Sequence, residues 1–349
     1  MIRIAIVGTG GMANAHAGAF NKMPGCRVVA GVDVDPARLQ AFCDRHGIAG
    51  RYASVRELLK SCDFDAASVV TPDAFHVPCA LPLVRAGKHV LCEKPIAPTA
   101  PEGRKLVEAA AKSGVINMIN FSYRNHAVLH AAHELVAAGR LGRIMHFEAH
   151  YLQSWLSSKV WGDWRTAAGW LWRCSSAHGS KGALGDIGVH IVDLATYAAA
   201  DRVVSLDARL KTFDKAPRNR IGEYVLDAND SAYLRVELAG GAVGTICATR
   251  WATGHANSLA LTLHGEKGAL RFDLDKSGVE FEVCLGADVD KARWKRRVCR
   301  PTPSIYQRFI RSIRTGRNDA SDFRRGWEVQ KVLDACFVAD KKGGRVTIR

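Results

Sequence analysis

The first 120 residues alternate between two hydrophobic patterns, and this alternation limits the possible folds more than any other feature. Continuous apolar runs, such as residues 3–8 (RIAIVG) and 26–34 (CRVVAGVDV), are typical of buried strands. The segments between the runs have helical spacing, and residues 35–47 begin with Asp-Pro and end with Gly. Buried strands joined by helices require a parallel sheet that is covered on both faces. The sequence therefore predicts an α/β fold with an N-terminal doubly wound parallel sheet.

The pattern changes after residue 122. A helical stretch at 126–144 is followed by segments that alternate apolar and polar residues, as strands with one exposed face do. These segments are residues 144–152, 203–213, 230–238, 242–251, 258–265 and 269–275. A chain of 349 residues is long enough for two domains. We expect a Rossmann domain at 1–122, and at 123–349 an α+β domain with a large, mostly antiparallel open sheet. The cleft between the two domains is then the expected ligand site.

Composition excludes several classes of protein. The ten cysteines form no C-x-x-C pair and no zinc-type cluster, so we expect reduced thiols and no metal site. The net charge is +15, yet only residues 291–300 are densely basic, and no zinc finger or basic helix with heptads is present. The charge is explained by a solvated surface or by attraction for an anionic cofactor or substrate, so no nucleic-acid partner is expected.

No run of about 18 apolar residues is present, so the sequence predicts no membrane partner. The apolar part of the N-terminus is too short for a signal sequence and runs directly into glycines. These features favour the cytoplasm.

The turn after the first apolar run fits the dinucleotide-binding pattern G-x-G-x-x-A. Its residues are Gly8, Thr9, Gly10, Gly11, Met12 and Ala13. Gly8 permits the tight turn, and Gly10 lets a pyrophosphate approach the N-terminus of the next helix. Asp33 ends the second strand, where a carboxylate binds an adenosine ribose and repels a 2′-phosphate. We expect NAD to bind better than NADP, although Arg38 could turn back toward a phosphate.

A second dense motif is GDIGVH at residues 185–190. On a helix, Asp186 and His190 project from one face, and Asp193 continues that face by another turn. An Asp and a His so placed can transfer protons. Two alternatives remain at this point: Asp186 near a helix cap with a hydrogen-bonded core histidine, or H-x-x-D as part of a metal site.

Together these motifs carry a family resemblance. It includes the glycine turn, TPDAFH at 71–76, CEKP at 92–95, Trp172-Arg173, GDIGVH, and DFRRGWEVQKVLDA at 322–335. The chain resembles the glucose–fructose oxidoreductase/inositol dehydrogenase/MocA-like family over its whole length.

The resemblance implies roles for individual residues. Lys94 would stand beside the nicotinamide and the substrate hydroxyl, followed by a peptide bond that is often cis, and would stabilise an alkoxide as hydride leaves. An ordinary ion pair with Glu93 is the alternative for Lys94. His190 matches the general acid/base, and Asp186 the acidic partner that shares the substrate hydroxyl or orients the histidine. Further matches line the cofactor or the substrate pocket: Thr71, Pro72, His76, Glu93, Arg124, Trp172 and Arg173. The family often places an aromatic residue after the arginine at position 124, where this chain has Asn125.

The implied activity is an NAD(P)-dependent dehydrogenase or reductase that acts on a sugar, polyol or derivative. Alternatives are a glycoside-cleaving or epimerising enzyme that recycles its cofactor, and a non-catalytic dinucleotide-binding regulator. Five tryptophans at 155, 161, 164, 170 and 172 suit either sugar rings or packing and subunit contact. An exposed sheet face would favour a homo-oligomer, a dimer or tetramer.

Overall fold

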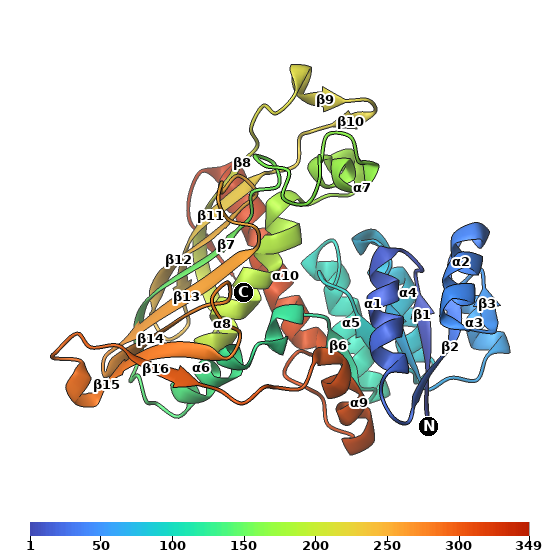
Figure 1. The fold of residues 1–349 in the computed structure, drawn as a ribbon, viewed down its shortest axis with the longest axis horizontal. Coiled ribbons are helices and arrows are strands. Elements are labelled where there is room, and N and C mark those ends of the chain that lie inside the picture. The colour runs from blue at the N-terminus through green and yellow to red at the C-terminus, as the bar shows by residue number, and fades with distance from the viewer. Residues whose placement is uncertain (349) are drawn as a thin grey trace. The chain divides into compact units, whose positions relative to one another are not determined.

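The computed structural model describes residues 1–348, which form two compact units. The first unit comprises Met1–Ser122 and Pro303–Gln330, and the second comprises Tyr123–Thr302 and the residues after Gln330. Figure 1 shows the chain from its N-terminus in blue to its C-terminus in red. No helix within residues 1–348 is both long and apolar enough to cross a bilayer.

The first unit contains the predicted doubly wound sheet. Its six strands are all parallel and lie in the order β3-β2-β1-β4-β5-β6. Their bounds are β1 Ile2–Val7, β2 Cys26–Val32, β3 Gly50–Tyr52, β4 Ala66–Val69, β5 His89–Cys92 and β6 Asn117–Ile119. The helices that connect them are α1 Gly11–Asn21, α2 Pro36–His46, α3 Val55–Ser61, α4 His76–Arg85 and α5 Ala100–Ser113. The strand order reverses beside β1, where β1 pairs with β2 on one side and β4 on the other. Open α/β sheets bind ligands at such a switch point.

Helix α9 (Ile305–Thr315) lies far along the chain but packs into the core of the first unit. Ile305, Phe309 and Ile310 are buried together with residues of β1 and α1. The helix begins with a capping box at Ser304. The domain limits 1–122 and 123–349 stay a prediction. By packing, however, residues 303–330 belong to the first unit, because the apolar face of α9 is buried in its core.

The second unit is built on a nine-stranded sheet in the order β16-β15-β14-β13-β7-β12-β11-β8-β17. The bounds are β7 Ile144–Leu152, β8 Val203–Lys211, β11 Ser231–Leu238, β12 Val243–Thr249, β13 Ser258–Gly265, β14 Gly268–Asp273, β15 Glu280–Leu285, β16 Lys295–Val298 and β17 Val346–Thr347. Neighbouring strands are antiparallel except for β7 and β12. The prediction of a mostly antiparallel sheet is confirmed, with one parallel pair that the local pattern did not indicate. A separate hairpin consists of β9 Arg220–Ile221 and β10 Tyr224–Val225.

Helices cover one face of this sheet. Helix α8 (Val189–Ala198) packs on β7 and β12, and α6 (Ala127–Ala137) packs on α8. Alternate residues of β7, including Phe147 and Ala149, are buried on this face. The C-terminal helix α10 (Phe323–Lys342) coincides with the motif at 322–335, and the division between the two units falls inside it.

Part of the basic stretch at 291–300 forms the edge strand β16. Lys295 pairs with Asp288 across 2.6 Å, and Arg296 pairs with Glu280 of β15. Charged side chains on an edge strand discourage pairing with another chain. The structure thus accounts for much of this charge as an edge strand with local ion pairs.

Candidate active site

The glycine turn lies between β1 and α1, and close packing explains its first glycine. Gly8 has a φ of +88°, and a Cβ added there would lie 2.9 Å from the backbone nitrogen of Thr71. The Gly8 N–H donates to the carbonyl of Val32 over 2.8 Å. At Gly10 and Gly11, an added Cβ would have no heavy atom of the described chain within 4 Å. The start of α1 is therefore open for a phosphate to approach its backbone N–H groups, which fits a dinucleotide.

Asp33 lies beside this turn and is held by it. The Thr9 N–H and hydroxyl each donate to Asp33 Oδ2 over 2.8 Å. Arg38 donates to both carboxylate oxygens, from Nε over 3.2 Å and from Nη2 over 3.1 Å. Burial by itself would raise the pKa of Asp33, but the hydrogen bonds from Asp35, Thr9 and Arg38 lower the pKa below its ordinary value. The carboxylate is thus ionised and oriented, and Arg38 points to it. Met12 is exposed in the first turn of α1.

Glu93 follows β5 and is anchored by a buried histidine of α1. His16 Nε2 donates to Glu93 Oε1 over 2.9 Å, and His16 Nδ1 lies 2.8 Å from the hydroxyl of Ser68. The amide of Asn120 also donates to Glu93 Oε1. Burial alone would raise the pKa of Glu93, but the hydrogen bond and charge of His16, with Lys94 and Asn120, lower it to about 2. Glu93 is therefore a largely buried carboxylate that stays ionised at neutral pH.

A second buried histidine anchors the other side of Lys94. His76 Nδ1 lies 2.6 Å from the carbonyl oxygen of Pro95, and His76 Nε2 lies 2.9 Å from that of Thr71. The Lys94–Pro95 peptide bond is cis, as the resemblance implies. Pro72 precedes the short 3₁₀ helix Asp73–Phe75 that leads into His76. Lys94 is thus flanked by two residues that buried histidines hold, and it lies just beyond the carboxyl end of β5, an interior strand of the sheet.

In the second unit, the GDIGVH motif begins with a wide helical turn. Leu184–Gly188 form one π-helical turn, and α8 follows directly. Asp186 is about one-third exposed, whereas His190 and Asp193 are buried. A π turn contains an extra residue and is frequent at functional sites. The two carboxylates that were expected on one helical face therefore differ: Asp186 is partly accessible, whereas Asp193 is buried.

Two arginines hold Asp186. Arg250 Nη2 donates to Asp186 Oδ2 over 3.0 Å, and Arg173 Nε lies 3.8 Å from the same oxygen. The guanidinium of Arg173 lies over the Trp172 ring, 4.6 Å from its centre. The structure thus brings three predicted site residues together, Asp186, Trp172 and Arg173, and adds Arg250.

His190 lies among aromatic side chains. Its ring meets that of Tyr123 edge-on, with centres 5.0 Å apart, and lies 6.4 Å from that of Tyr151. The two tyrosine hydroxyls hydrogen-bond to each other, and Asn257 bonds to both over 2.7 Å. Burial, with the contribution of Tyr123, raises the pKa of Tyr151 well above its ordinary value. These neutral phenols surround His190 with a polar but uncharged wall.

Arg124 lies in a buried ion pair. It donates to both oxygens of Asp193, over 2.7 and 2.6 Å, and its guanidinium lies 3.9 Å from the centre of the Tyr197 ring. Its side chain is 1% exposed. Asp193 is therefore used in helix packing, and a contact between Arg124 and the substrate remains a prediction.

The tryptophan-rich segment divides between core and surface. Trp155 and Trp164 are buried in a cluster with Leu171. Trp161 is exposed and stacks on Trp170 with ring centres 5.9 Å apart. Core packing thus accounts for two tryptophans, while the Trp161–Trp170 pair leaves an aromatic face accessible.

Several residues of these networks were not predicted from the sequence. His16 had a local signal, because it shares the buried face of α1 with Ala13, Ala17 and Phe20. Tyr123, Asn257 and Arg250 had none, since their partners lie far away along the chain; Arg250 and Asp186, for example, are 64 residues apart.

Comparisons with known proteins agree with this geometry. The NAD-binding Rossmann model of the GFO/IDH/MocA oxidoreductase family matches residues 2–121, and the model of that family's C-terminal domain matches 129–271. Levoglucosan dehydrogenase of Pseudarthrobacter phenanthrenivorans is 25% identical over 99% of this chain and 98% of its own. Inositol 2-dehydrogenase of Rubrobacter xylanophilus is 26% identical over 98% of this chain and 92% of its own.

A solved structure of levoglucosan dehydrogenase in complex with NADH has a TM-score of 0.87 and 25% identity, and the match covers 100% of this chain and 99% of that one. The two family models together match most of this chain, and the glycine turn with its ordered Asp33 has the form that a dinucleotide requires. This chain therefore belongs to the GFO/IDH/MocA family of NAD-binding oxidoreductases.

Proposed function

We propose that this protein transfers hydride between NAD and a hydroxyl or carbonyl carbon of a sugar, polyol or derivative. The observation that carries the proposal is that Lys94 lies two residues after the end of β5, between the anchored residues Glu93 and Pro95. A lysine in that position provides a cation where ligands bind in open α/β sheets. The relatives named for levoglucosan and inositol support the substrate class.

The proposal assigns a role to each reacting side chain. Asp33 and the start of α1 would hold NAD, which would supply the hydride acceptor. The Lys94 ammonium stabilises negative charge on the substrate oxygen, which develops only as the reaction proceeds. His190 takes the hydroxyl proton, and Asp186 supplies a fixed negative charge that orients the substrate or the imidazolium. Asp33 accepts hydrogen bonds from the adenosine ribose, and the start of α1 binds the pyrophosphate.

A substrate screen tests the proposal. Purified protein is incubated with NAD or NADP and a panel of sugars and polyols, and NADH formation is followed by absorbance. We expect turnover with at least one cyclic sugar or polyol, and NAD preferred over NADP. Product analysis with catalytic amounts of NAD then separates net oxidation from a reaction that recycles its cofactor. Absence of both NADH formation and product across the panel would contradict the proposal.

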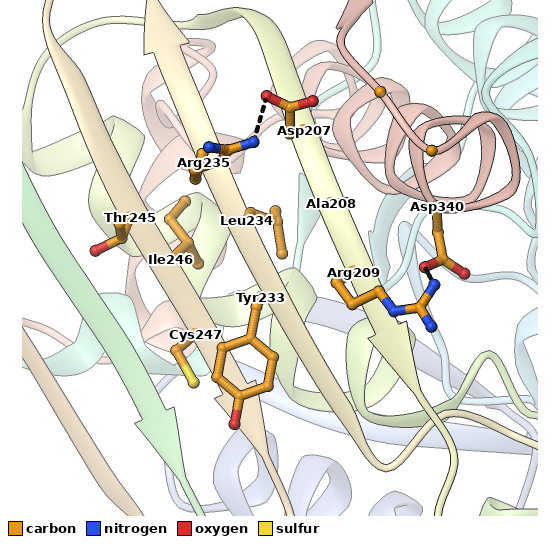
Figure 2. A pocket seen from close by; sticks show the side chains of 12 residues that line it. Asp207, Ala208, Arg209, Tyr233, Leu234, Arg235, Thr245, Ile246, Cys247 and Asp340 are labelled. Carbon is orange, nitrogen blue, oxygen red and sulfur yellow. Dashed lines mark hydrogen bonds and ion pairs between the residues drawn. The ribbon is translucent and has the colours of Figure 1, made fainter.

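We further propose that the open face of the large sheet forms the interface of a homodimer or homotetramer. Side chains of β8, β11 and β12 line a hollow on this face, with Tyr233 and Cys247 among them (Figure 2). Tyr233 and Val243 are 52% and 54% exposed, although both lie within strands. Light scattering after size exclusion should give a multiple of 38.0 kDa, and Tyr233→Asp should shift the mass toward the monomer. A monomeric wild-type protein would contradict this proposal.

We also propose a cytoplasmic location. All ten cysteines are free thiols, and five of them are buried. Free thiols in this number favour a reducing compartment. Cell fractionation with an antibody to the protein would test this, and recovery outside the cytoplasm would contradict it.

A further inference from the structure

Arg250 is a buried cation that links three segments of the second unit. Its side chain is 0% exposed. It donates to the carbonyl of Arg173 over 3.0 Å, to the carbonyl of Gly182 over 3.2 Å, and to Asp186 Oδ2 over 3.0 Å. Its guanidinium also lies 5.0 Å from the centre of the Trp155 ring. One side chain thus contacts the Trp172-Arg173 segment, the backbone of Gly182 just before the GDIGVH segment, and the Asp186 carboxylate within that segment.

We propose that Arg250 is a positioning residue that keeps Asp186 ionised and oriented for proton transfer by His190. The proposal rests on the proposed function, because it assigns Arg250 to the same reaction. Arg250 acts through Asp186 and is not itself placed against the substrate.

Burial makes the charge of Arg250 significant. A guanidinium removed from water is unfavourable unless hydrogen bonds and an opposite charge compensate it. Here two carbonyls and the Asp186 carboxylate provide this compensation. Arginine keeps its proton at any pH at which the protein is folded, so the contribution of Arg250 to the field at Asp186 does not vary with pH.

The arrangement separates the roles of Asp186 and His190. Both Arg250 and Arg173 contact Oδ2 of Asp186, and about one-third of the aspartate side chain remains exposed. Protonation of this carboxylate would weaken its ion pairs with both arginines, and the geometry therefore favours the anion. The carboxylate remains a good hydrogen-bond acceptor. The proton of the substrate hydroxyl therefore goes to His190, while Asp186 stays an anion throughout the cycle.

The competing interpretation is that Arg250 only holds loops together. The two interpretations differ in whether the effect of losing Arg250 depends on the charge of Asp186. A double-mutant cycle with Arg250→Met and Asp186→Asn measures this dependence. Arg250→Lys serves as the conservative variant because it keeps the charge. Lys215→Met is the matched control, since Lys215 is also a fully buried cation of this unit, 2.8 Å from Asp230.

We expect Arg250→Met to lower kcat by on the order of 10²-fold, with NAD affinity within about twofold of the wild type. In the Asp186→Asn background the same change should lower kcat by less than about threefold. Arg250→Lys, which keeps the charge, should have a kcat at least about tenfold higher than that of Arg250→Met. Lys215→Met should leave kcat per folded molecule within about threefold of the wild type.

Equal losses from Arg250→Met in both backgrounds would overturn the proposal, as would an equal loss in Lys215→Met. If Arg250→Met does not fold, the same cycle is run with Arg250→Gln, which removes the charge but keeps an amide that can donate to the carbonyls, and equal losses in both backgrounds again overturn it. If the wild type transfers hydride to no compound in the screen, the proposed function fails. The cycle is then measured as the change in urea midpoint that Arg250→Met causes. A smaller change in the Asp186→Asn background than in the wild type supports the coupling of Arg250 to Asp186, and an equal change overturns it.

Discussion

The Lys94 segment of the first unit and the Asp186–His190 segment of the second are anchored by different chemistry. Glu93 and Pro95, on either side of Lys94, are held by the buried imidazoles of His16 and His76. Asp186 is held by Arg250 and Arg173, whose charges are permanent. The comparison teaches that two segments with proposed roles in one reaction can be held by different kinds of partner, backbone and imidazole contacts in one and fixed cations in the other.

The difference also separates the expected effects of substitution. In the first unit, the anchors act on the backbone and on a neighbour of Lys94, so they control where the lysine lies. In the second, the anchor acts directly on a charge of the proposed proton-transfer pair. The predictions below are ordered by the size of the expected effect.

Loss of His190 should have the largest effect. We expect His190→Ala to lower the turnover of alcohol oxidation by about 10²–10⁴-fold, because the hydroxyl proton loses its acceptor. The rise of turnover with pH through a single ionisation should disappear in this variant, as measured from pH–rate profiles. His133→Ala is the control. His133 of α6 bonds to the carbonyl of Tyr197 on α8, the helix that also carries His190, and its loss should change turnover only slightly. An unaltered rate and profile in His190→Ala would make His190 a core histidine.

Lys94→Ala tests the first segment. We expect turnover to fall by on the order of 10²-fold or more, because the ammonium acts where charge develops on the substrate oxygen. NAD affinity, measured by calorimetry, should remain nearly unchanged. Near wild-type turnover would reduce Lys94 to a structural ion pair with Glu93. The acid-base profile of this variant also shows whether Lys94 contributes to the ionisation assigned to His190.

Glu93 should make the stability of the first unit depend on pH. Its pKa of about 2 is below the ordinary value of 4.5, so its contribution is fully present above pH 4.5 and is lost as the pH falls toward 2. The difference corresponds to about 3 kcal/mol of unfolding free energy. Urea denaturation between pH 5 and pH 2 should therefore show a steeper loss in the wild type than in Glu93→Gln.

An exposed ion pair provides the control for Glu93. Glu108 pairs with Arg104 on the surface of α5, where both side chains are more than half exposed. Glu108→Gln should change the unfolding free energy by less than about 1 kcal/mol at any pH in this range. Parallel pH curves for the wild type and Glu93→Gln would show that Glu93 is not a stabilising anion.

Asp33 should have the smallest effect, on cofactor choice. We expect Asp33→Ala to weaken NAD binding by about tenfold and NADP binding by less, because a 2′-phosphate no longer meets a carboxylate. The change also releases Arg38, which now bonds to Asp33 and would become available to a phosphate. Calorimetric titration of both cofactors measures the ratio. An unchanged ratio would remove Asp33 from the cofactor site.

Local sequence patterns determined much of the architecture. The predicted strands at 144–152 and 258–265 coincide with β7 and β13, and the helix at 35–47 coincides with α2, which Gly47 ends in a left-handed conformation. These features follow from periodicity and capping, which neighbouring residues encode. The glycine turn was predicted from its local pattern between a strand and a helix. The close approach of Gly8 to Thr71, which also excludes a side chain there, is a tertiary contact that this pattern does not state.

Only the tertiary structure decided which side chains anchor the site. His16 meets Glu93 across 77 residues and Arg250 meets Asp186 across 64, so the packing of whole elements brings each pair together. The parallel pairing of β7 with β12 and the packing of α9 in the first unit are non-local in the same way. Hydrophobic periodicity states which face of an element is buried, but it does not state what lies opposite that face. The sequence by itself therefore determined the elements and the reacting residues to be tested, while the fold decided the partners that fix their charge and orientation.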